Sequence, residues 1–382
     1  MMLLEQTRKR NPQLIEVVNN FHRTGKIRPD SYCLDVDQFI ENAKMMIDTA
    51  NREGIKLYFM LKQVARNPYL AKKLCDLGYA GAVVVDYKEA KIMMEHNIPI
   101  GNIGHLVQVP NSFLEEVILY RPEVITVYSL EKVSRIHELC KKNNLKQSIL
   151  IRVVGHNDHL YSGQNAGIFL NELSDFISEV KKMDTITVEG VTSFPAILYQ
   201  ENKKQFETTE NMNTILEAKK ILENLGISIS QVNTPSATCC RTIPLLKKNG
   251  GTHGEPGHGL SGTTPAHANL DLDEKPCVIY LSEISHHFQG KSYCYGGGHY
   301  RRSHLKSALV QNNLVHVYPP DVESIDYHFW LDGIHPIGEA VVMAFRFQMF
   351  VTRSDLVLIE GIKSGSPKII GVYDSLGKEL DL

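Results

Sequence analysis

The feature that most constrains the fold is a regular alternation of short apolar runs with longer segments of helical periodicity, between about residues 31 and 260. This alternation is typical of parallel α/β proteins, because a helix usually connects one parallel strand to the next. An open, doubly wound sheet would satisfy the alternation too, but eight runs are the number that a closed (β/α)8 barrel needs, and we favour the barrel. The predicted strands are 57–62, 81–85, 102–107, 124–128, 148–154, 188–193, 228–234 and 252–258.

After Pro265 the pattern changes to short strand-like runs separated by Gly, Pro and Asp turns, which predicts a β domain. We therefore expect an N-terminal segment at residues 1–35 that packs with the β domain, a (β/α)8 barrel at 36–264 and a C-terminal β domain at 265–382. The clearest helix start is Asn67-Pro68, a capping residue followed by proline, which opens a helix that ends at Gly78.

Composition excludes several classes of function. Forty-one Lys and Arg residues against 43 Asp and Glu give a formal charge of −2, so no whole-protein field attracts nucleic acid or anionic lipid. No window approaches 18 consecutive apolar residues, and the N-terminus becomes charged too early for a signal-peptide core. The seven cysteines are scattered and form no C-x-x-C pair, which favours reduced thiols. We expect a cytoplasmic protein that binds neither nucleic acid nor a membrane.

Lys62 is the first candidate for chemistry, because it ends the first predicted strand. The carboxyl ends of barrel strands build active sites, and burial lowers the pKa of an amine, which makes it a competent nucleophile for Schiff-base formation. A lysine whose side chain extends from the strand end into solvent fits the same position equally well.

The second candidate is a glycine-rich stretch, residues 250–262, at the end of the eighth predicted strand; it holds six glycines in thirteen positions. Glycines let backbone amides approach an anion, and barrels commonly bind phosphate in the loops after their last two strands. The stretch has neither the Gly-Lys-Ser/Thr of a P-loop nor a Rossmann fingerprint. A flexible interdomain loop is the alternative. Together, a strand-end lysine and a phosphate loop indicate pyridoxal phosphate, which needs both.

These features carry a resemblance to a known family. The chain resembles the alanine-racemase-like, fold type III pyridoxal-phosphate enzymes, which combine a barrel with a β domain. The similar segments are SYCLDVDQFIEN from Ser31, LYFMLKQVARNPYLAKKLCDLGYAGAVVVDYKEA from Leu57, YSGQNAGI from Tyr161, VEGVTSFPA from Val188, VNTPSA from Val232 and HGEPGHGLSG from His253.

The resemblance implies roles for individual residues. It places the Schiff-base lysine at Lys62 and phosphate contacts at Ser236, Gly257, His258 and Gly259. Glu255 falls where family members place the group that faces the pyridine nitrogen: alanine racemases carry arginine there, and basic amino-acid decarboxylases of this fold carry glutamate in an E-P-G motif. A carboxylate stabilises a protonated pyridinium, whereas a guanidinium cannot accept that proton.

Three further residues follow from the same resemblance. Arg152 would hydrogen-bond the cofactor or a substrate carboxylate, or else form an ion pair that holds the barrel. Phe194 or Ser193 stands near where many relatives place a histidine on the cofactor ring, and Phe194 would stack there instead. The second acid/base group comes from the β domain of the other subunit; we favour Tyr295 over Tyr293, Cys294 and Tyr300, because it directly precedes a glycine turn.

The resemblance implies a homodimer with shared active sites and an amino-acid substrate. We predict a racemase or epimerase in which Lys62 holds an internal aldimine and exchanges the α-proton. The alternatives are a decarboxylase or a D-amino-acid lyase of the same fold, a protein that carries the cofactor without catalysis, and a barrel enzyme unrelated to it. The decarboxylases' late C-x-x-x-D signature and the lyases' metal-binding His-x-Cys are missing. We expect no metal site, since the histidines have no carboxylate or cysteine partners at ligand spacing.

Overall fold

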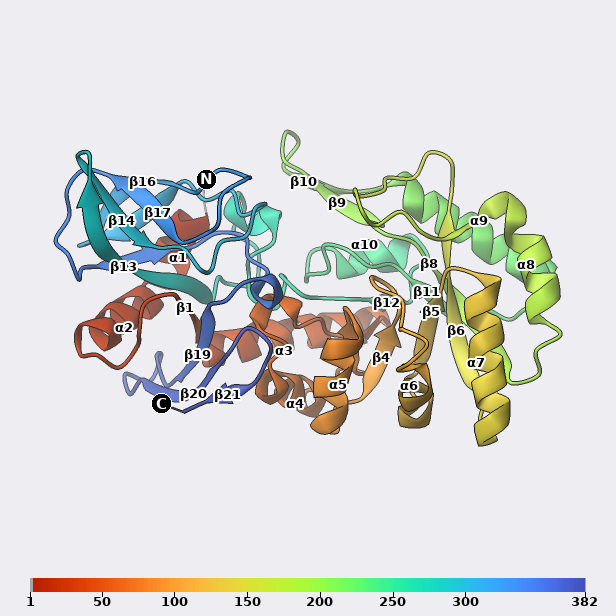
Figure 1. The fold of residues 1–382 in the computed structure, drawn as a ribbon. Helices are drawn as coiled ribbons and strands as arrows, with labels where there is room; N and C mark the ends of the chain where they lie inside the picture. The colour runs from red at the N-terminus through yellow and green to blue at the C-terminus, as the bar shows by residue number, and fades with distance from the viewer. Residues whose placement is uncertain (1–2, 382) are drawn as a thin grey trace. The chain divides into compact units, whose positions relative to one another are not determined.

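The structure is a computed structural model that describes residues 3–381. It divides into two compact units. The barrel unit consists of Met46–Leu61 and Pro68–Gly257; the second unit consists, within the described residues, of 3–45, Lys62–Asn67 and 258–381. Figure 1 shows the elements of both units along the chain.

Eight parallel strands form the barrel unit. They are β2 (Lys56–Leu57), β3 (Ala82–Val84), β4 (Ile100–Ile103), β5 (Val124–Val127), β6 (Gln147–Val154), β8 (Ile186–Thr192), β11 (Gln231–Asn233) and β12 (His253–Gly254). Their order in the sheet is β2-β12-β11-β8-β6-β5-β4-β3, and a parallel bridge from Phe59 to Ala82 joins the two ends. Phe59 N donates to Gly81 O at 2.9 Å, and Val83 N donates to Phe59 O at 2.7 Å, so the eight strands form a closed ring.

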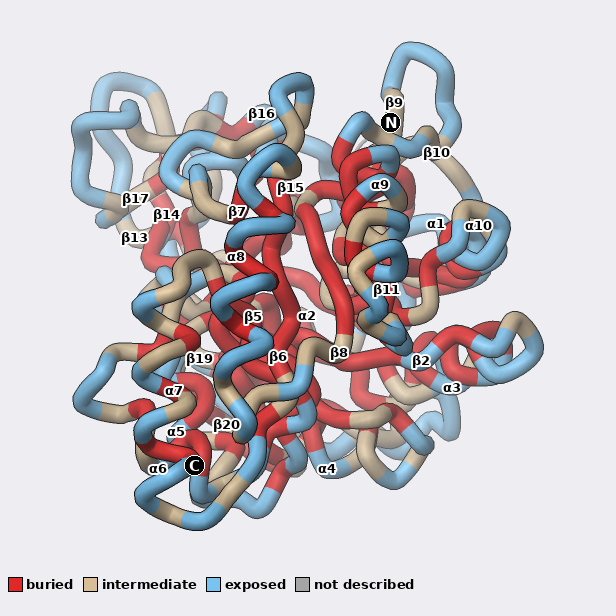
Figure 2. Tube along the Cα trace, turned by 90° about the vertical axis from the view of Figure 1, so that its right-hand side faces the viewer, coloured by how far each residue is buried: buried red, intermediate tan, exposed pale blue. Residues whose placement is uncertain are grey.

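Helices connect these strands and cover the ring. They are α3 (Val36–Glu53), α4 (Pro68–Asp76), α5 (Tyr87–Glu95), α6 (Leu114–Tyr120), α7 (Leu130–Asn143), α8 (Leu173–Val180), α9 (Glu210–Asn224) and α10 (Ile243–Lys248), of which α3 belongs partly to each unit. Figure 2 shows β5 and β6 buried and the outer sides of α7 and α8 exposed. The short elements are β7 (Ile168–Phe169), which pairs with β6, the 3-10 turn η2 (Leu170–Glu172) and a hairpin of β9 (Ile197–Gln200) and β10 (Gln205–Thr208).

Local signals account for several helix boundaries. α4 begins at Pro68, as predicted, because proline lacks the N–H that would be unpaired at this position. The chain leaves this helix through Gly78, whose φ of +96° suits glycine. Asp86 caps α5 by accepting a hydrogen bond from Glu89 N at 2.9 Å.

The predicted barrel and the C-terminal β domain are confirmed, and each of the eight runs contains or overlaps a strand of the ring. The first run differs, because its strand is only Lys56–Leu57 and Lys62 opens the 3-10 turn η1 (Lys62–Val64) rather than ending a strand. The chain between them stays extended, since Tyr58 N bonds Gly254 O at 3.1 Å and Met60 N bonds Pro256 O at 2.9 Å.

The second unit is built on an antiparallel β structure. Six of its strands close into a second ring, because β13 pairs with both β14 and β18. The ring contains β13 (Val278–Phe288), β14 (Lys291–Tyr295), β17 (His328–Asp332), β16 (Asn313–Tyr318), β15 (Ser307–Val310) and β18 (Ala340–Met343). From β13 the sheet continues through β1 (Ser31–Asp35), β19 (Asp355–Glu360), β20 (Lys368–Tyr373) and β21 (Glu379–Leu380).

The N-terminal segment packs on this β structure. β1 lies between β13 and β19, antiparallel to the first and parallel to the second. The helices α1 (Leu3–Arg10) and α2 (Pro12–Arg23) bury Leu4, Leu14 and Val18 in one core with Leu281 and Val342. Two 3-10 turns, η3 (Pro265–Ala268) and η4 (Met349–Val351), complete the unit. No helix within residues 3–381 has the length and apolar character needed to cross a membrane.

The buried His253 on β12 predicts an acid-sensitive barrel. Its ring lies 5.3 Å from that of Tyr58, and burial, followed by the charge of Lys56, lowers the pKa of His253 to about 4. The unfolded chain takes up this proton near pH 6.5 while the folded barrel does not, so the free energy of unfolding falls between about pH 6.5 and 4. His253→Gln should make the decrease in the free energy of unfolding between these pH values smaller by up to about 3 kcal/mol. Urea unfolding at a series of pH values measures this free energy.

The matched control is His96→Gln, which changes an exposed histidine. An identical pH dependence in His253→Gln and wild type would contradict the assignment.

Candidate active site

Polar side chains gather at the carboxyl ends of the barrel strands. Each of these residues is between 0 and 7% exposed, which is unusual for polar residues unless they are hydrogen-bonded or have a role in function. They are Asn102 on β4, Thr126 on β5, Arg152 on β6, Thr192 on β8, Asn233 on β11 and Glu255 just after β12. This end of the strands is where (β/α)8 barrels build their active sites.

Glu255 lies in the interior of the ring. Its Oε1 accepts hydrogen bonds from Asn102 Nδ2 at 3.2 Å and from Asn233 Nδ2 at 2.6 Å. The two asparagines come from β4 and β11, which are four strands apart whichever way the ring is followed, so they lie on opposite walls. An atom that bonds both walls must lie between them. Two N–H donors on one oxygen suit an ionised carboxylate, which can only accept.

Two neighbours hold this arrangement. Thr126 Oγ1 donates to Asn102 Oδ1 at 2.7 Å, which orients the Asn102 amide so that its nitrogen faces Glu255. The backbone N–H of Glu255 donates to Thr238 Oγ1 at 3.1 Å. The carboxylate position is therefore determined by side chains from at least four segments of the barrel unit.

Arg152 is among the largest fully buried side chains within the described residues. Its guanidinium donates to His105 O at 3.2 Å, to Tyr128 OH at 3.2 Å and to Gln164 O at 2.7 Å, and it lies 5.3 Å from the Tyr128 ring centre. No carboxylate is among these partners, so the alternative of an ion pair that holds the barrel has no support in them.

Two buried polar atoms on neighbouring strands have no hydrogen-bond partner within residues 3–381. They are Arg152 Nε on β6 and Thr192 Oγ1 on β8, and the two residues are paired in the sheet register. Leaving buried polar atoms unpaired is unfavourable by about 1–3 kcal/mol each, which a bound molecule with acceptor oxygens would offset. The donor set therefore fits an oxygen-rich ligand at the barrel mouth.

His105 and Phe194 form an aromatic pair near Arg152. His105 is 1% exposed, and its ring centre lies 6.1 Å from that of half-buried Phe194 in an edge-on arrangement. Tyr161 also contacts Phe194, at 5.6 Å between ring centres. Sequence reasoning missed His105; the signal for it is a histidine inside the predicted strand 102–107, close to its carboxyl end. In the structure it lies two residues after the end of β4.

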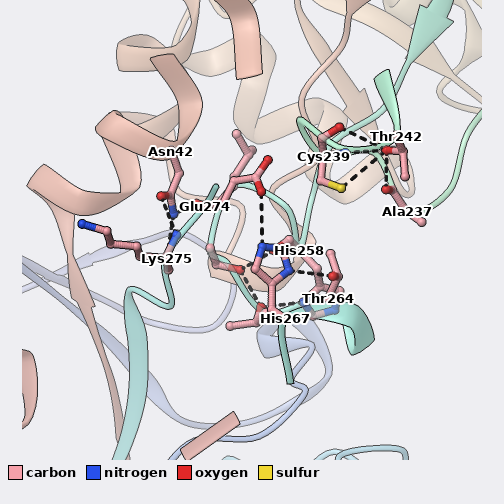
Figure 3. A network of polar contacts seen from close by, with 12 residues as sticks. Asn42, Ala237, Cys239, Thr242, His258, Thr264, His267, Glu274 and Lys275 are labelled. Carbon is pink, nitrogen blue, oxygen red and sulfur yellow. Dashed lines mark hydrogen bonds and ion pairs between the residues drawn. The ribbon is translucent and has the colours of Figure 1, made fainter. Parts of the chain in front are cut away.

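Ser236 lies in a turn of unusual backbone geometry in the barrel unit. Ser236 and Ala237 have φ angles of +118° and +50°, and Thr242 Oγ1 closes the turn by donating to Ala237 O at 2.8 Å (Figure 3). Ser236 Oγ donates to Ile197 O on β9 at 2.6 Å. A phosphate at this turn would compete with Ile197 for the hydroxyl proton or bind the turn's backbone.

Lys62 and His258 belong to the second unit. Lys62 is half-buried at the start of η1. His258 Nδ1 lies 3.0 Å from Thr263 Oγ1, and its Nε2 lies 3.3 Å from Gln348 Nε2. Burial lowers the pKa of His258 well below its usual value, and the nearby charges of Arg346 and Lys62 add to this. The neutral ring can therefore accept from Gln348 and donate to Thr263.

Asp35 and Asn42 belong to the segment SYCLDVDQFIEN, which resembles the family, and both have hydrogen-bond partners in the structure. Asp35 accepts from Gln38 N at 3.1 Å at the start of α3. Asn42 on α3 donates to Leu260 O at 3.0 Å and to Lys275 O at 2.8 Å, and it accepts from Lys275 N at 2.9 Å (Figure 3). Through these hydrogen bonds Asn42 fixes the position of Leu260, the residue that directly follows Gly259.

Tyr295 is the last residue of β14 and is 37% exposed. Its neighbour Cys294 is fully buried, and burial raises the pKa of Cys294 to about 12, so this thiol is a poor base. Within residues 3–381 no group of three or more His, Cys, Asp or Glu side chains could hold a metal ion.

Comparison with known proteins assigns the family. Residues 34–265 match the family model of the alanine racemase N-terminal domain, which is more than half of the chain. The chain belongs to the alanine-racemase-like, fold type III family of pyridoxal-phosphate-dependent enzymes. Residues 279–369 match a second family model, the YhfX-like C-terminal domain. The chain is 44% identical over 388 residues to the protein YhfX of Escherichia coli (strain K12), across 99% of this chain and 100% of that protein.

Solved structures of similar fold come from enzymes with different reactions. A D-threonine aldolase from Filomicrobium marinum aligns with a TM-score of 0.69 and 13% identity, over 92% of this chain and 96% of that one. An alanine racemase from Clostridium difficile 630 aligns with a TM-score of 0.65 and 17% identity, over 91% and 98%. A D-threo-3-hydroxyaspartate dehydratase from Delftia sp. HT23 aligns with a TM-score of 0.67 and 13% identity, over 89% and 96%. These likenesses show a shared fold and leave the reaction open.

Proposed function

We propose that this protein is a pyridoxal-phosphate-dependent amino-acid racemase or epimerase. The observation that most supports breaking a bond at Cα on this cofactor is the Glu255 carboxylate, held inside the barrel by amides from opposite walls. The preference for racemisation rests on the missing C-x-x-x-D signature of the decarboxylases and the missing His-x-Cys of the lyases. A fixed carboxylate at the pyridine nitrogen would keep that nitrogen protonated. When bound, pyridoxal phosphate then supplies a strong electron sink for the electron pair of a broken bond at the amino acid's Cα.

We propose a role toward the cofactor for each of the following residues. Lys62 would bind it covalently, Arg152 would donate to its oxygens, and Phe194 with His105 would face its ring. The phosphate would be held at Ser236, Gly257, His258 and Gly259. The unpaired Arg152 Nε and Thr192 Oγ1 support a ligand rich in acceptor oxygens at this mouth.

Racemisation needs one base on each face of Cα. We propose that Lys62 Nζ takes and returns the α-proton on one face and that Tyr295 OH of a partner subunit serves the other. The exposure of Tyr295 at the end of its strand is compatible with that role, whereas buried Cys294 is not. In a two-fold homodimer each β domain would then complete its neighbour's site.

Lys62 should be the residue that carries the cofactor. Borohydride reduction of the wild-type protein should fix the cofactor on the Lys62 peptide, and Lys62→Ala should abolish that adduct. Peptide mass spectrometry measures both. Lys56→Ala, which removes an exposed lysine on β2, should retain the adduct. An adduct on any other lysine of the wild type would refute the assignment.

Glu255→Gln should slow exchange of the substrate α-proton by at least about tenfold, equivalent to roughly 1.4 kcal/mol of transition-state stabilisation, because the neutral amide no longer favours a protonated ring nitrogen. The measurement is α-deuterium incorporation from deuterated water with single enantiomers of amino acids, together with chirality and released carbon dioxide. Glu201→Gln, at an exposed position, is the control.

The same measurement separates racemisation from the alternatives. Deuterium incorporation with loss of chirality is expected. Release of carbon dioxide, or cleavage of the Cα–Cβ bond, would instead indicate a decarboxylase or a lyase, and an unchanged exchange rate in Glu255→Gln would mean that the carboxylate has no part in the reaction.

Tyr295→Phe should remove the second base. Mixing inactive Lys62→Ala chains with inactive Tyr295→Phe chains should restore about a quarter of wild-type activity, because half of randomly mixed dimers are mixed and each has one complete site. Tyr293→Phe, on the same strand, serves as the matched control and should remain active alone. If demonstrably exchanging, folded subunits show no complementation, Tyr295 does not act across the dimer.

A further inference from the structure

The chain that follows Lys62 has an unusual backbone. After η1, Ala65 and Arg66 have φ angles of +57° and +54°, so two consecutive residues with side chains adopt the left-handed conformation. Left-handed residues other than glycine are sterically unfavourable and persist only where the surroundings hold them, which is most often at functional sites. Both residues are buried.

A turn near the C-terminus lies against these two residues. A Cβ added at Gly377 would stand 2.9 Å from Ala65 O and 3.1 Å from Arg66 O, so only glycine allows this close approach. Asp374 organises the turn: Gly377 N donates to Asp374 O at 3.1 Å, and the backbone N–H groups of Leu376 and Lys378 each donate to Asp374 Oδ1 at 2.9 Å.

A second segment of the same unit supports Arg66 from η4. The Arg66 guanidinium lies 5.3 Å from the ring centre of Phe350. Two residues before Phe350, Gln348 Nε2 lies 3.3 Å from His258 Nε2. One short segment thus contacts both the chain after Lys62 and a residue of the proposed phosphate loop.

We propose that the turn 374–378, through Gly377, is a positioning element for Lys62. It packs against the carbonyl oxygens of Ala65 and Arg66 and keeps the backbone of these two residues in the left-handed conformation. The direction of the chain at 65–66 in turn determines where η1 lies, with Lys62 at its start. This inference rests on the proposed role of Lys62 in binding the cofactor. Gly377 and its turn act through the backbone of 65–66 and do not themselves take part in the reaction.

The experiment compares two glycines that share a backbone conformation. Gly377 has φ +88° and Gly338 has φ +84°, but a Cβ at Gly338 would meet nothing within 4 Å. Gly377→Ala and Gly338→Ala therefore introduce the same left-handed alanine, and only the first presses on Ala65 and Arg66. Hydrogen exchange of the full-length protein, purified without added cofactor, reports on amides 62–67 directly.

We expect exchange of amides 62–67 to be about tenfold or more faster in Gly377→Ala than in Gly338→Ala. We also expect the cofactor concentration for half-saturation, read from its absorption band, to rise about fivefold or more in Gly377→Ala alone. If Gly377→Ala does not fold, Asp374→Ala carries the test by the same criteria, because it removes the oxygen that accepts from Leu376 N and Lys378 N and so loosens the same turn. Unchanged exchange of 62–67 in a folded variant would overturn the proposal.

The proposed function can fail separately. Borohydride trapping on another lysine of the wild type would remove the cofactor role of Lys62. The exchange measurement on cofactor-free protein would still decide whether Gly377 holds the chain after it.

Discussion

The rest of the site depends on the contact between one buried carboxylate and two amides that reach it from opposite walls of the barrel. Burying a carboxyl group without hydrogen bonds is unfavourable, and Asn102 and Asn233 both donate to Glu255 Oε1. That requires a closed ring, which the bridge from Phe59 to Ala82 provides. The closure of the sheet and the chemistry available at its mouth are thus linked through a single oxygen atom.

Periodicity is a local property, and what depends on it could be predicted from the sequence. The eight barrel strands follow from apolar runs, and the start of α4 follows from Pro68. The candidate roles of Lys62 and Glu255 follow from their places in the first and last of these runs, together with the family resemblance.

Contacts between residues far apart in sequence could not be predicted. His105 gains its interest from Phe194 and Arg152, which lie 89 and 47 residues further along the chain and reach it only through the fold. The pairing of β13 with both β14 and β18 joins runs that look equivalent in the sequence. The conformation after Lys62 depends on Gly377, and a short-range pattern contains no information about that partner.

The six-stranded ring in the second unit has a consequence for association. In an open sheet, both outermost strands expose unpaired N–H and C=O groups, which can template pairing with other chains. Because β13 pairs with β14, one end of the ten-stranded sheet is consumed within the ring. Within the described residues the other end is β21, which has only two residues, Glu379 and Leu380. The ten-stranded sheet of the second unit therefore has very little exposed strand edge with which another chain could pair and aggregate.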